Sequence, residues 1–148
     1  MTDGEHKNKW WNDHPALMAV GVVDATCESV FETIKSLGPS RSEWDFCFLR
    51  GKVVEKLDGH TDIIHKQFHS SWLSCEGMDP REFLLHRYWR REDDGSYVIL
   101  YNSVTHTKCP PCKGFVQACL KNGGYVISPL NHKEKPACAV VKYMLTVD

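Results

Sequence analysis

The sequence predicts an α+β domain in which a curved antiparallel β-sheet carries few helices. Roughly eight segments of strand length follow one another with short turns between them, which favours antiparallel pairing. Only one segment has the three- and four-residue apolar spacing of an amphipathic helix. The 148 residues fit one domain that is long enough to bury a core without disulfides or metals, and 42% of them are hydrophobic.

The chain begins with a polar segment. Residues 1–15 contain few apolar side chains and end at a proline, so we predict a tail or linker remnant followed by one domain over residues 16–148. The run from Ala16 to Val23 is apolar throughout, which is typical of a strand covered on both faces.

One helix is predicted to begin after Thr26, whose side chain can cap the first turn. Apolar residues then recur on one face, at Cys27, Val30, Phe31, Ile34 and Leu37. Gly38 and Pro39 end the helix. The next segment, residues 40–46, is predicted to be a short link with Trp44 anchored in the core.

Hairpins account for the rest of the sheet. Turn signals at residues 58–60, 93–96 and 122–124 each separate two runs of strand length. The strands predicted around these turns are residues 47–57, 61–70, 81 to the second turn, 97–101, 113–121 and 125–130, and residues 139–147 form the last strand. Both faces of residues 97–101 carry bulky side chains, so this strand is predicted to be central.

One face of the strand before the second turn is apolar except for one charge. Phe83, Leu85 and Trp89 share this face, because alternate side chains of a strand point to the same side. Arg87 lies on that side as well. A guanidinium is therefore expected where apolar side chains point.

Charge and hydropathy exclude several classes of function. The net charge of −1 gives no broad attraction to nucleic acid. Strand alternation also separates Arg90 from Arg87 and Arg91, and three acidic residues follow, so no continuous basic track forms. No run reaches the ~20 apolar residues of a membrane span, and the polar start lacks the apolar core of a signal peptide. We therefore expect a cytoplasmic protein, free or peripheral to membranes, that binds no nucleic acid.

Seven cysteines without regular spacing fit reduced thiols better than a disulfide framework. Cys109 and Cys112 have the spacing of a metal knuckle or a redox dithiol, and His106 and Cys119 could complete four ligands. The pair is not repeated, and it lies in a loop between strands and not at the start of a helix. We therefore expect two free thiols, with no metal and no other cofactor.

The histidines do not predict a catalytic centre. His60 and Asp62 share one face of a predicted strand while His65 points to the other, so no triad is assembled locally. The sequence has no nucleophile elbow, phosphate-binding glycine loop or HExxH motif. We therefore expect no catalytic residues and no enzyme activity.

Two segments resemble the START (steroidogenic acute regulatory protein-related lipid transfer) domain family. They are RYWRREDDGSYVILYNSV at residues 87–104 and KGFVQACLKNGGYVISPL at residues 113–130. The resemblance runs from about Trp10 to Asp148, also includes AVGVVDATCESVFETI, SRSEWDF and LDGHTDIIHKQ, and is closest to the plant enhanced disease resistance group. It implies a helix-grip fold, in which a curved sheet and covering helices enclose one hydrophobic lipid, and hence a lipid carrier or sensor.

The resemblance also assigns lipid-binding residues. Arg87 matches the position where START proteins place an arginine inside the tunnel, and Gln67 falls near the position of an acidic partner in some relatives. A glutamine there would leave the arginine less neutralised, which favours an anionic or zwitterionic phospholipid over a sterol. The residues expected to contact the lipid are Arg87, Gln67, Phe83, Leu85, Trp89, Trp72, Leu73 and Met78.

The last three of these residues lie in the segment 71–80, which mixes Gly, Pro and small polar residues with apolar ones. A loop folded back on the core is the commoner case for such a segment. START domains carry a flexible loop here that helps to cover the mouth of the tunnel. The resemblance therefore favours contact of this loop with the lipid and a transient contact of the protein with a membrane surface.

In the START fold a long C-terminal helix follows the last strand and closes the tunnel, whereas this sequence ends at Asp148. The resemblance thus predicts a domain that lacks the C-terminal gripping helix and is shortened at both ends. An uncovered apolar sheet face is expected to self-associate or to meet a missing flanking segment. The second hypothesis is accordingly a regulatory protein-interaction module derived from a START domain, and the third is an enzyme that reuses the cavity.

Overall fold

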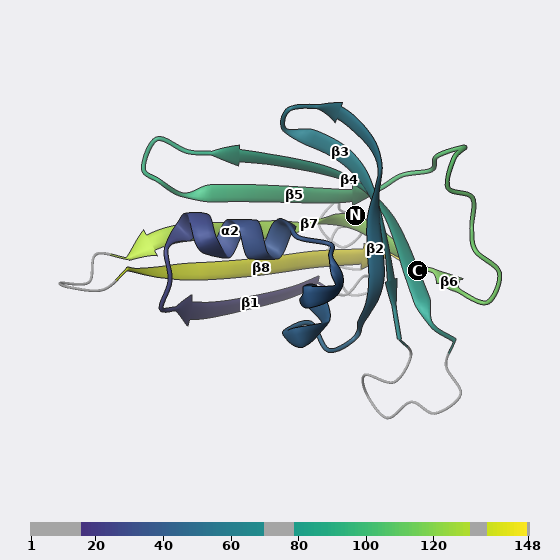
Figure 1. The fold of residues 1–148 in the computed structure, drawn as a ribbon, viewed down its shortest axis with the longest axis horizontal. Coiled ribbons are helices and arrows are strands. Elements are labelled where there is room, and N and C mark those ends of the chain that lie inside the picture. Colours follow the sequence, from purple (N-terminus) through teal and green to yellow (C-terminus); the bar gives the residue numbers. More distant parts are fainter. Residues whose placement is uncertain (1–15, 70–78, 131–135, 148) are drawn as a thin grey trace, which may run out of the picture.

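The computed structural model describes residues 16–69, 79–130 and 136–147. An antiparallel sheet runs through these residues with its strands in the order β1-β8-β7-β5-β4-β3-β2, and the short strand β6 pairs parallel to β4 (Figure 1). The strands are β1 (Ala16–Val23), β2 (Phe48–Asp58), β3 (Thr61–Phe68), β4 (Arg81–Arg91), β5 (Tyr97–Ser103), β6 (Val116–Gln117), β7 (Cys119–Leu130) and β8 (Ala137–Val147). The helical segments are the α-helix α2 (Cys27–Lys35) and the 3-10 helix η1 (Pro39–Glu43). Neither helix in these described residues has the length and the hydrophobicity that a membrane span requires.

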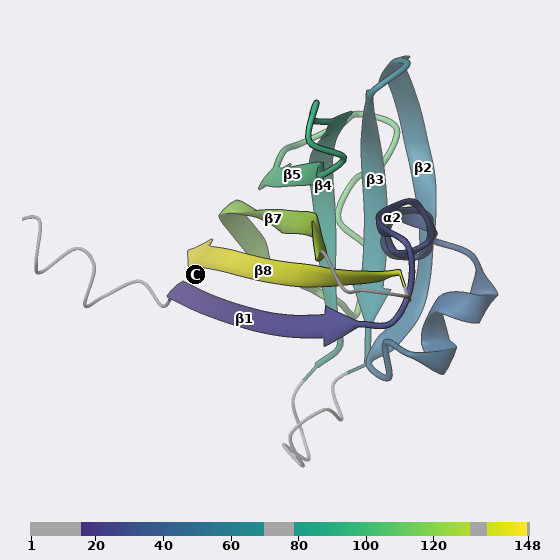
Figure 2. The same ribbon diagram turned by 90° about the vertical axis from the view of Figure 1, so that its left-hand side faces the viewer.

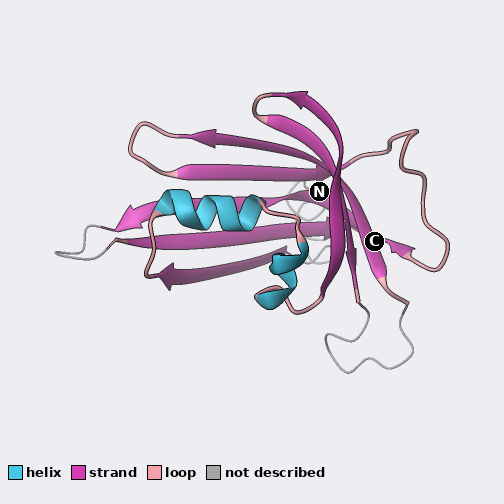
Figure 3. Cartoon of the chain, viewed as in Figure 1, coloured by secondary structure: helices cyan, strands magenta, loops and turns pink. Residues whose placement is uncertain are grey.

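The sheet curves around helix α2. Figure 2 shows α2 inside the curve, between the β8 side and the β2–β3 side of the sheet. The helix fits there because Cys27, Phe31 and Ile34 form its buried stripe. The Thr26 side chain accepts a hydrogen bond from the Ser29 N–H at 3.1 Å and caps the helix start. The predicted helix and the predicted curved antiparallel sheet are both confirmed (Figure 3).

The concave face of the sheet and α2 together enclose the core. The buried residues that pack there are Cys27, Phe31, Ile34, Ile64, Leu85, Ile99, Tyr101, Leu120, Tyr125, Ile127 and Cys138. Burial of one large aliphatic or aromatic side chain stabilises a fold by about 1.5–3 kcal/mol, so this cluster contributes much of the stability. Strand β5 lies between β4 and β7, which confirms that it is central.

The prediction that residues 16–23 are covered on both faces is wrong. In the described sheet β1 is an edge strand beside β8, and all of its residues are exposed. Trp44 is also not anchored in the core: it is 41% exposed, and the buried Arg41 places its guanidinium carbon 4.6 Å from the Trp44 ring centre. An apolar residue marks a capacity for burial, but it does not identify the segment that would cover it.

The turn predicted at residues 122–124 is wrong as well, because β7 runs from Cys119 to Leu130. Residues 113–121 likewise do not form one strand, since β6 and β7 are separate there. The glycines have a packing role instead. A Cβ atom on Gly124 would collide with the Ile99 carbonyl group of the neighbouring strand β5. The glycines that resemble a turn signal thus let two strands approach closely.

Gly124→Ala is therefore expected to lower the melting temperature, because the new methyl group would push β5 and β7 apart. Overpacking of a well-packed core costs about 1–3 kcal/mol, and we expect a loss of stability in this range. Gly21→Ala is the matched control, since no other part of the described chain lies within 4 Å of a Cβ atom at that position. Thermal denaturation of both variants checks the prediction, and equal melting temperatures would contradict it.

Candidate functional site

A pocket of about 180 Å³ opens on the concave face of the sheet, next to η1. Its walls come from η1 and the residues after it, from β3, β4 and β5, and from β7 and β8. The residues that line it are Arg41, Asp45, Lys66, Phe68, Phe83, Leu85, Tyr101, Leu120, Gly124, Tyr125, Lys142, Tyr143 and Met144. The pocket thus combines mostly apolar and aromatic side chains with a few polar groups, as sites for small molecules do.

Lys66 places an amine in this pocket without an acidic partner. The residue is 6% exposed, and among the described residues no carboxylate lies within ion-pairing distance of its Nζ. Its Nζ lies 4.8 Å from the centre of the Tyr101 ring, in a cation–π contact. Burial holds the pKa of Lys66 well below its usual value of 10.5, and the nearby positive charges of Arg41 and Arg87 act in the same direction.

The hydroxyl of Tyr101 is the second polar group of the pocket. It is buried and has no hydrogen-bond partner among the described residues. Burial raises the pKa of Tyr101 above its usual value of 10, although Arg87 and Arg41 act in the opposite direction, so the hydroxyl stays neutral and can both donate and accept. A buried polar group without a partner costs about 1–3 kcal/mol, which a bound ligand could offset.

Arg41 and Asp45 are already paired. Arg41 donates from Nη1 to the carbonyl oxygens of two residues at the end of α2, and from Nε to Asp45 Oδ2 at 3.2 Å. This bonding fixes the end of α2 beside the pocket. In the described part of the chain, the pocket therefore holds a buried hydroxyl, from Tyr101, that has no hydrogen-bond partner, and a buried amine, from Lys66, that has no carboxylate partner.

Arg87 is paired within the protein. Its Nε and Nη2 donate to the two carboxylate oxygens of Asp62 at 2.9 and 2.7 Å, and its Nη1 donates to the Lys35 carbonyl oxygen at 2.7 Å. Both side chains of the ion pair are 3% exposed. Arg87 and Asp62 face each other across β4 and β3, and the third bond ties them to the last residue of α2. The guanidinium therefore holds the helix onto the sheet, and its charge is neutralised inside the protein.

The acidic partner of Arg87 is thus Asp62 and not residue 67. Gln67 lies on the opposite face of β3, because residues 62 and 67 are separated by an odd number of positions in a regular strand. It is buried there, and its side-chain amide contacts Arg50 and Glu82. The argument that a glutamine leaves the arginine less neutralised is therefore wrong, and it gives no reason to prefer a phospholipid over a sterol.

The structure places the other predicted residues as follows. Phe83 and Leu85 line the pocket. Trp89 points to the same face of β4 but lies near α2, where the centre of its ring is 4.3 Å from Lys35 Nζ. Outside the described residues fall Trp72, Leu73 and Met78.

Sequence reasoning misses Lys66 and Tyr101, although a signal for the first is present. Lys66 shares a strand face with Ile64 and Phe68, so it stands out from apolar neighbours in the same way as Arg87 does. Tyr101 is recognisable as a residue of a central strand, but the fold is needed to show where its hydroxyl points.

Comparison with known protein families identifies the domain. Residues 5–148 match the sequence profile of the START domain. The chain belongs to the START domain family. This START chain is 43% identical over 133 residues to "Protein ENHANCED DISEASE RESISTANCE 2-like" of Arabidopsis thaliana, and 25% identical over 125 residues to START domain-containing protein 10 of mouse and of human. The matches comprise 90% and 84% of this chain but only 18% of the plant protein and 40% of the mammalian proteins, so the chain spans less than half of these relatives.

Solved structures share the fold of this START domain. The human StarD13 (DLC2) lipid transfer and protein localization domain matches with a TM-score of 0.72 and 24% identity, over 90% of this chain and 64% of that one. Human StAR-related lipid transfer protein 5 matches with a TM-score of 0.73 and 18% identity, over 97% of this chain and 77% of that one. These neighbours confirm the helix-grip fold that the sequence predicts.

Proposed function

We propose that this START domain binds one lipid in its concave pocket and acts as a carrier or sensor and not as an enzyme. The observation that carries the proposal is a mostly apolar pocket with two buried polar groups. Among the described residues, the Tyr101 hydroxyl has no hydrogen-bond partner and the Lys66 amine has no carboxylate partner. Membership of the START family supports lipid binding as a class of function. A carrier also has to meet a membrane surface transiently to exchange its lipid.

The apolar wall of the pocket supplies affinity for acyl chains. Phe83, Leu85 and Met144 contribute to this wall, and burial of apolar surface against such side chains contributes about 25 cal/mol per Å². The volume of 180 Å³ is below the roughly 300–1,000 Å³ of typical ligand sites. We therefore expect the pocket to hold the headgroup end of the lipid, with the rest of its chains along the concave face.

The lipid is expected to carry an acidic group such as a phosphate or a carboxylate. Lys66 is buried among other positive charges, so an anionic oxygen would neutralise its amine and accept its hydrogen bonds. The Tyr101 hydroxyl can donate a second hydrogen bond to the same group or to an ester carbonyl. A sterol would offer only a hydroxyl, which cannot neutralise a protonated amine.

Native mass spectrometry of the chain tests the proposal directly. The chain is incubated with vesicles that contain phosphatidic acid, phosphatidylcholine and cholesterol in equal amounts. We expect a monomer that retains one lipid mass, with phosphatidic acid enriched over the other two. A chain that retains none of these lipids would contradict lipid binding, and retention of cholesterol alone would contradict the acidic headgroup.

A protein-interaction role is the second candidate, and the exposed edge strand β1 favours it. Leu17, Met18, Val20 and Val22 are between 66% and 71% exposed. An edge strand also offers backbone N–H and C=O groups to a further strand, and β1 of a second copy could pair with it antiparallel about a two-fold axis. In the same mass spectra, this role predicts a lipid-free dimer.

A further inference from the structure

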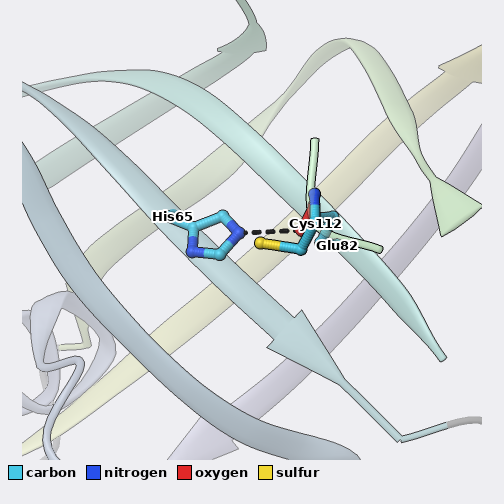
Figure 4. Close-up of side chains that lie close together, drawn as sticks. All are labelled: His65, Glu82 and Cys112. Atoms are coloured by element: carbon cyan, nitrogen blue, oxygen red, sulfur yellow. Dashed lines mark hydrogen bonds and ion pairs between the residues drawn. The ribbon is translucent and has the colours of Figure 1, made fainter. Parts of the chain in front are cut away.

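Three potential metal ligands meet on the convex face of the sheet, which is the face opposite α2 and the lipid pocket. His65 of β3, Glu82 of β4 and Cys112 of the segment between β5 and β6 each place a ligand atom within 4.8 Å of the other two (Figure 4). His65 Nε2 and Glu82 Oε2 are 3.0 Å apart. Both of these residues are buried, whereas the Cys112 side chain is accessible at the surface of the protein.

Strand register and one loop explain why these side chains converge. In the β3–β4 ladder Glu82 is paired with Gln67, so His65 is its diagonal neighbour on the same face. The Cys112 N–H donates to Glu82 Oε1 at 2.8 Å, and the Gln117 side-chain amide donates to the same oxygen at 3.0 Å. One carboxylate thus holds the loop in place, and this brings the Cys112 thiol beside the imidazole of His65.

The three side chains have the chemistry of a zinc site. Imidazole nitrogen, carboxylate oxygen and thiolate sulfur are the usual protein ligands of Zn²⁺, at bond lengths of about 2.0–2.3 Å. Ligand atoms around a tetrahedral ion lie roughly 3.5 Å apart, so a shift of roughly 1 Å in one side chain closes the spread of the cluster. The two charges of the ion would also be matched by one carboxylate and one thiolate, which makes the site neutral overall.

We propose that His65, Glu82 and Cys112 bind one Zn²⁺ ion, with the fourth coordination position open to a cavity on the convex face. His65 would bind as the neutral imidazole through Nε2, in place of its hydrogen bond to Glu82, and the Cys112 thiol would release its proton to solvent. The cavity has a volume of about 530 Å³ and is lined in part by His65 and Glu82. It has room for a water molecule or a small exchangeable ligand at the open position.

The outer contacts of the cluster fit this role. The Gln117 amide and the Cys112 N–H hold the carboxylate of Glu82 from behind, as hydrogen-bonding partners of metal ligands usually do. His106 is otherwise engaged: its Nδ1 accepts a hydrogen bond from the Lys108 N–H at 3.0 Å, and its Nε2 contacts a carboxylate oxygen of Glu55.

The site differs from the four-ligand set that the spacing of the cysteines suggests. Cys109 and Cys119 line the convex cavity, but within the described residues neither thiol belongs to the cluster of converging ligand atoms. The site therefore uses one cysteine of the Cys-x-x-Cys pair. Its other ligands come from β3 and β4, and only the fold brings them to that cysteine.

Cobalt substitution tests the site in the 148-residue chain, with its thiols kept reduced. Co²⁺ that is bound by a thiolate gives a charge-transfer band in the near ultraviolet, and we expect one equivalent of CoCl₂ to saturate this band and ZnCl₂ to abolish it. Cys112→Ser should lose the band and keep its melting temperature, because its backbone N–H still donates to Glu82. Gln117→Ala should weaken cobalt binding about 10-fold, since it frees the carboxylate.

Cys119→Ser is the matched control, because this cysteine lines the same cavity but lies outside the cluster. It should keep the full band. The proposal is overturned if the wild-type chain gives no saturable band, if Cys112→Ser retains it, or if Cys119→Ser loses it. If Cys112→Ser does not fold, Gln117→Ala tests the proposal in its place. The site then requires that Gln117→Ala binds Co²⁺ more weakly than Cys119→Ser does.

Discussion

Arg87→Leu should destabilise this START domain by about 3–5 kcal/mol, because it removes one partner of a buried ion pair. Asp62 would be left at a site that is 3% exposed, without the two hydrogen bonds that it accepts from Arg87. The Lys35 carbonyl oxygen would lose its donor as well, which loosens the end of α2 from the sheet. Thermal and denaturant-induced unfolding measure the effect.

Two further variants make this result specific. Arg90→Leu, on the same strand, removes an exposed ion pair with Glu92 and should change the melting temperature little. Arg87→Leu combined with Asp62→Leu should recover most of the lost stability, because the stranded charge is gone. If Arg87→Leu lowers lipid retention and leaves the melting temperature as high as that of Arg90→Leu, then Arg87 is a lipid ligand and its structural role is refuted.

The sequence predicts the fold of this domain more completely than its site. Strand alternation is enough to place Arg87 among apolar side chains, and the cost of burying a charge requires that it has a partner. The pattern does not say which residue that partner is. Asp62 is 25 positions away in sequence and reaches Arg87 only through the register of β3 against β4.

Residues 122–124 likewise show that a local sequence pattern does not identify the distant residues that determine its structure. Two adjacent glycines are typical of a turn, and they are equally typical of strands whose backbones pack closely. Glycine is needed at position 124 because a Cβ atom there would collide with Ile99 of a neighbouring strand. The residues next to the glycines in the sequence therefore cannot reveal this requirement. The proposed zinc ligands are likewise supplied by three separate segments, and the Cys-x-x-Cys spacing indicates only one of them.

Lys66→Met should stabilise the lipid-free domain at neutral pH by about 1–3 kcal/mol, because methionine keeps the apolar stem of the side chain and removes the buried amine. Burial holds the pKa of Lys66 well below 10.5 in the folded chain, so below pH 10.5 the unfolded chain binds the proton more readily. The stability of the wild-type chain is therefore reduced by Lys66 at neutral pH, and this loss diminishes as the pH rises toward 10.5. The difference in melting temperature between Lys66→Met and the wild-type chain should accordingly be smaller near pH 10 than at pH 7.

The same substitution should remove the proposed preference for an acidic lipid. A hydrogen bond to a charged group contributes about 1.5–3 kcal/mol, so the affinity for phosphatidic acid should fall about 10- to 100-fold, while that for phosphatidylcholine changes less. Lys113→Met, at an exposed position outside the pocket, is the control in competition measurements against a fluorescent lipid. If Lys66→Met is more stable than the wild-type chain and yet binds phosphatidic acid equally tightly, the buried amine does not bind the headgroup. That result would not contradict lipid binding itself, because native mass spectrometry tests lipid binding independently through the mass of the retained lipid.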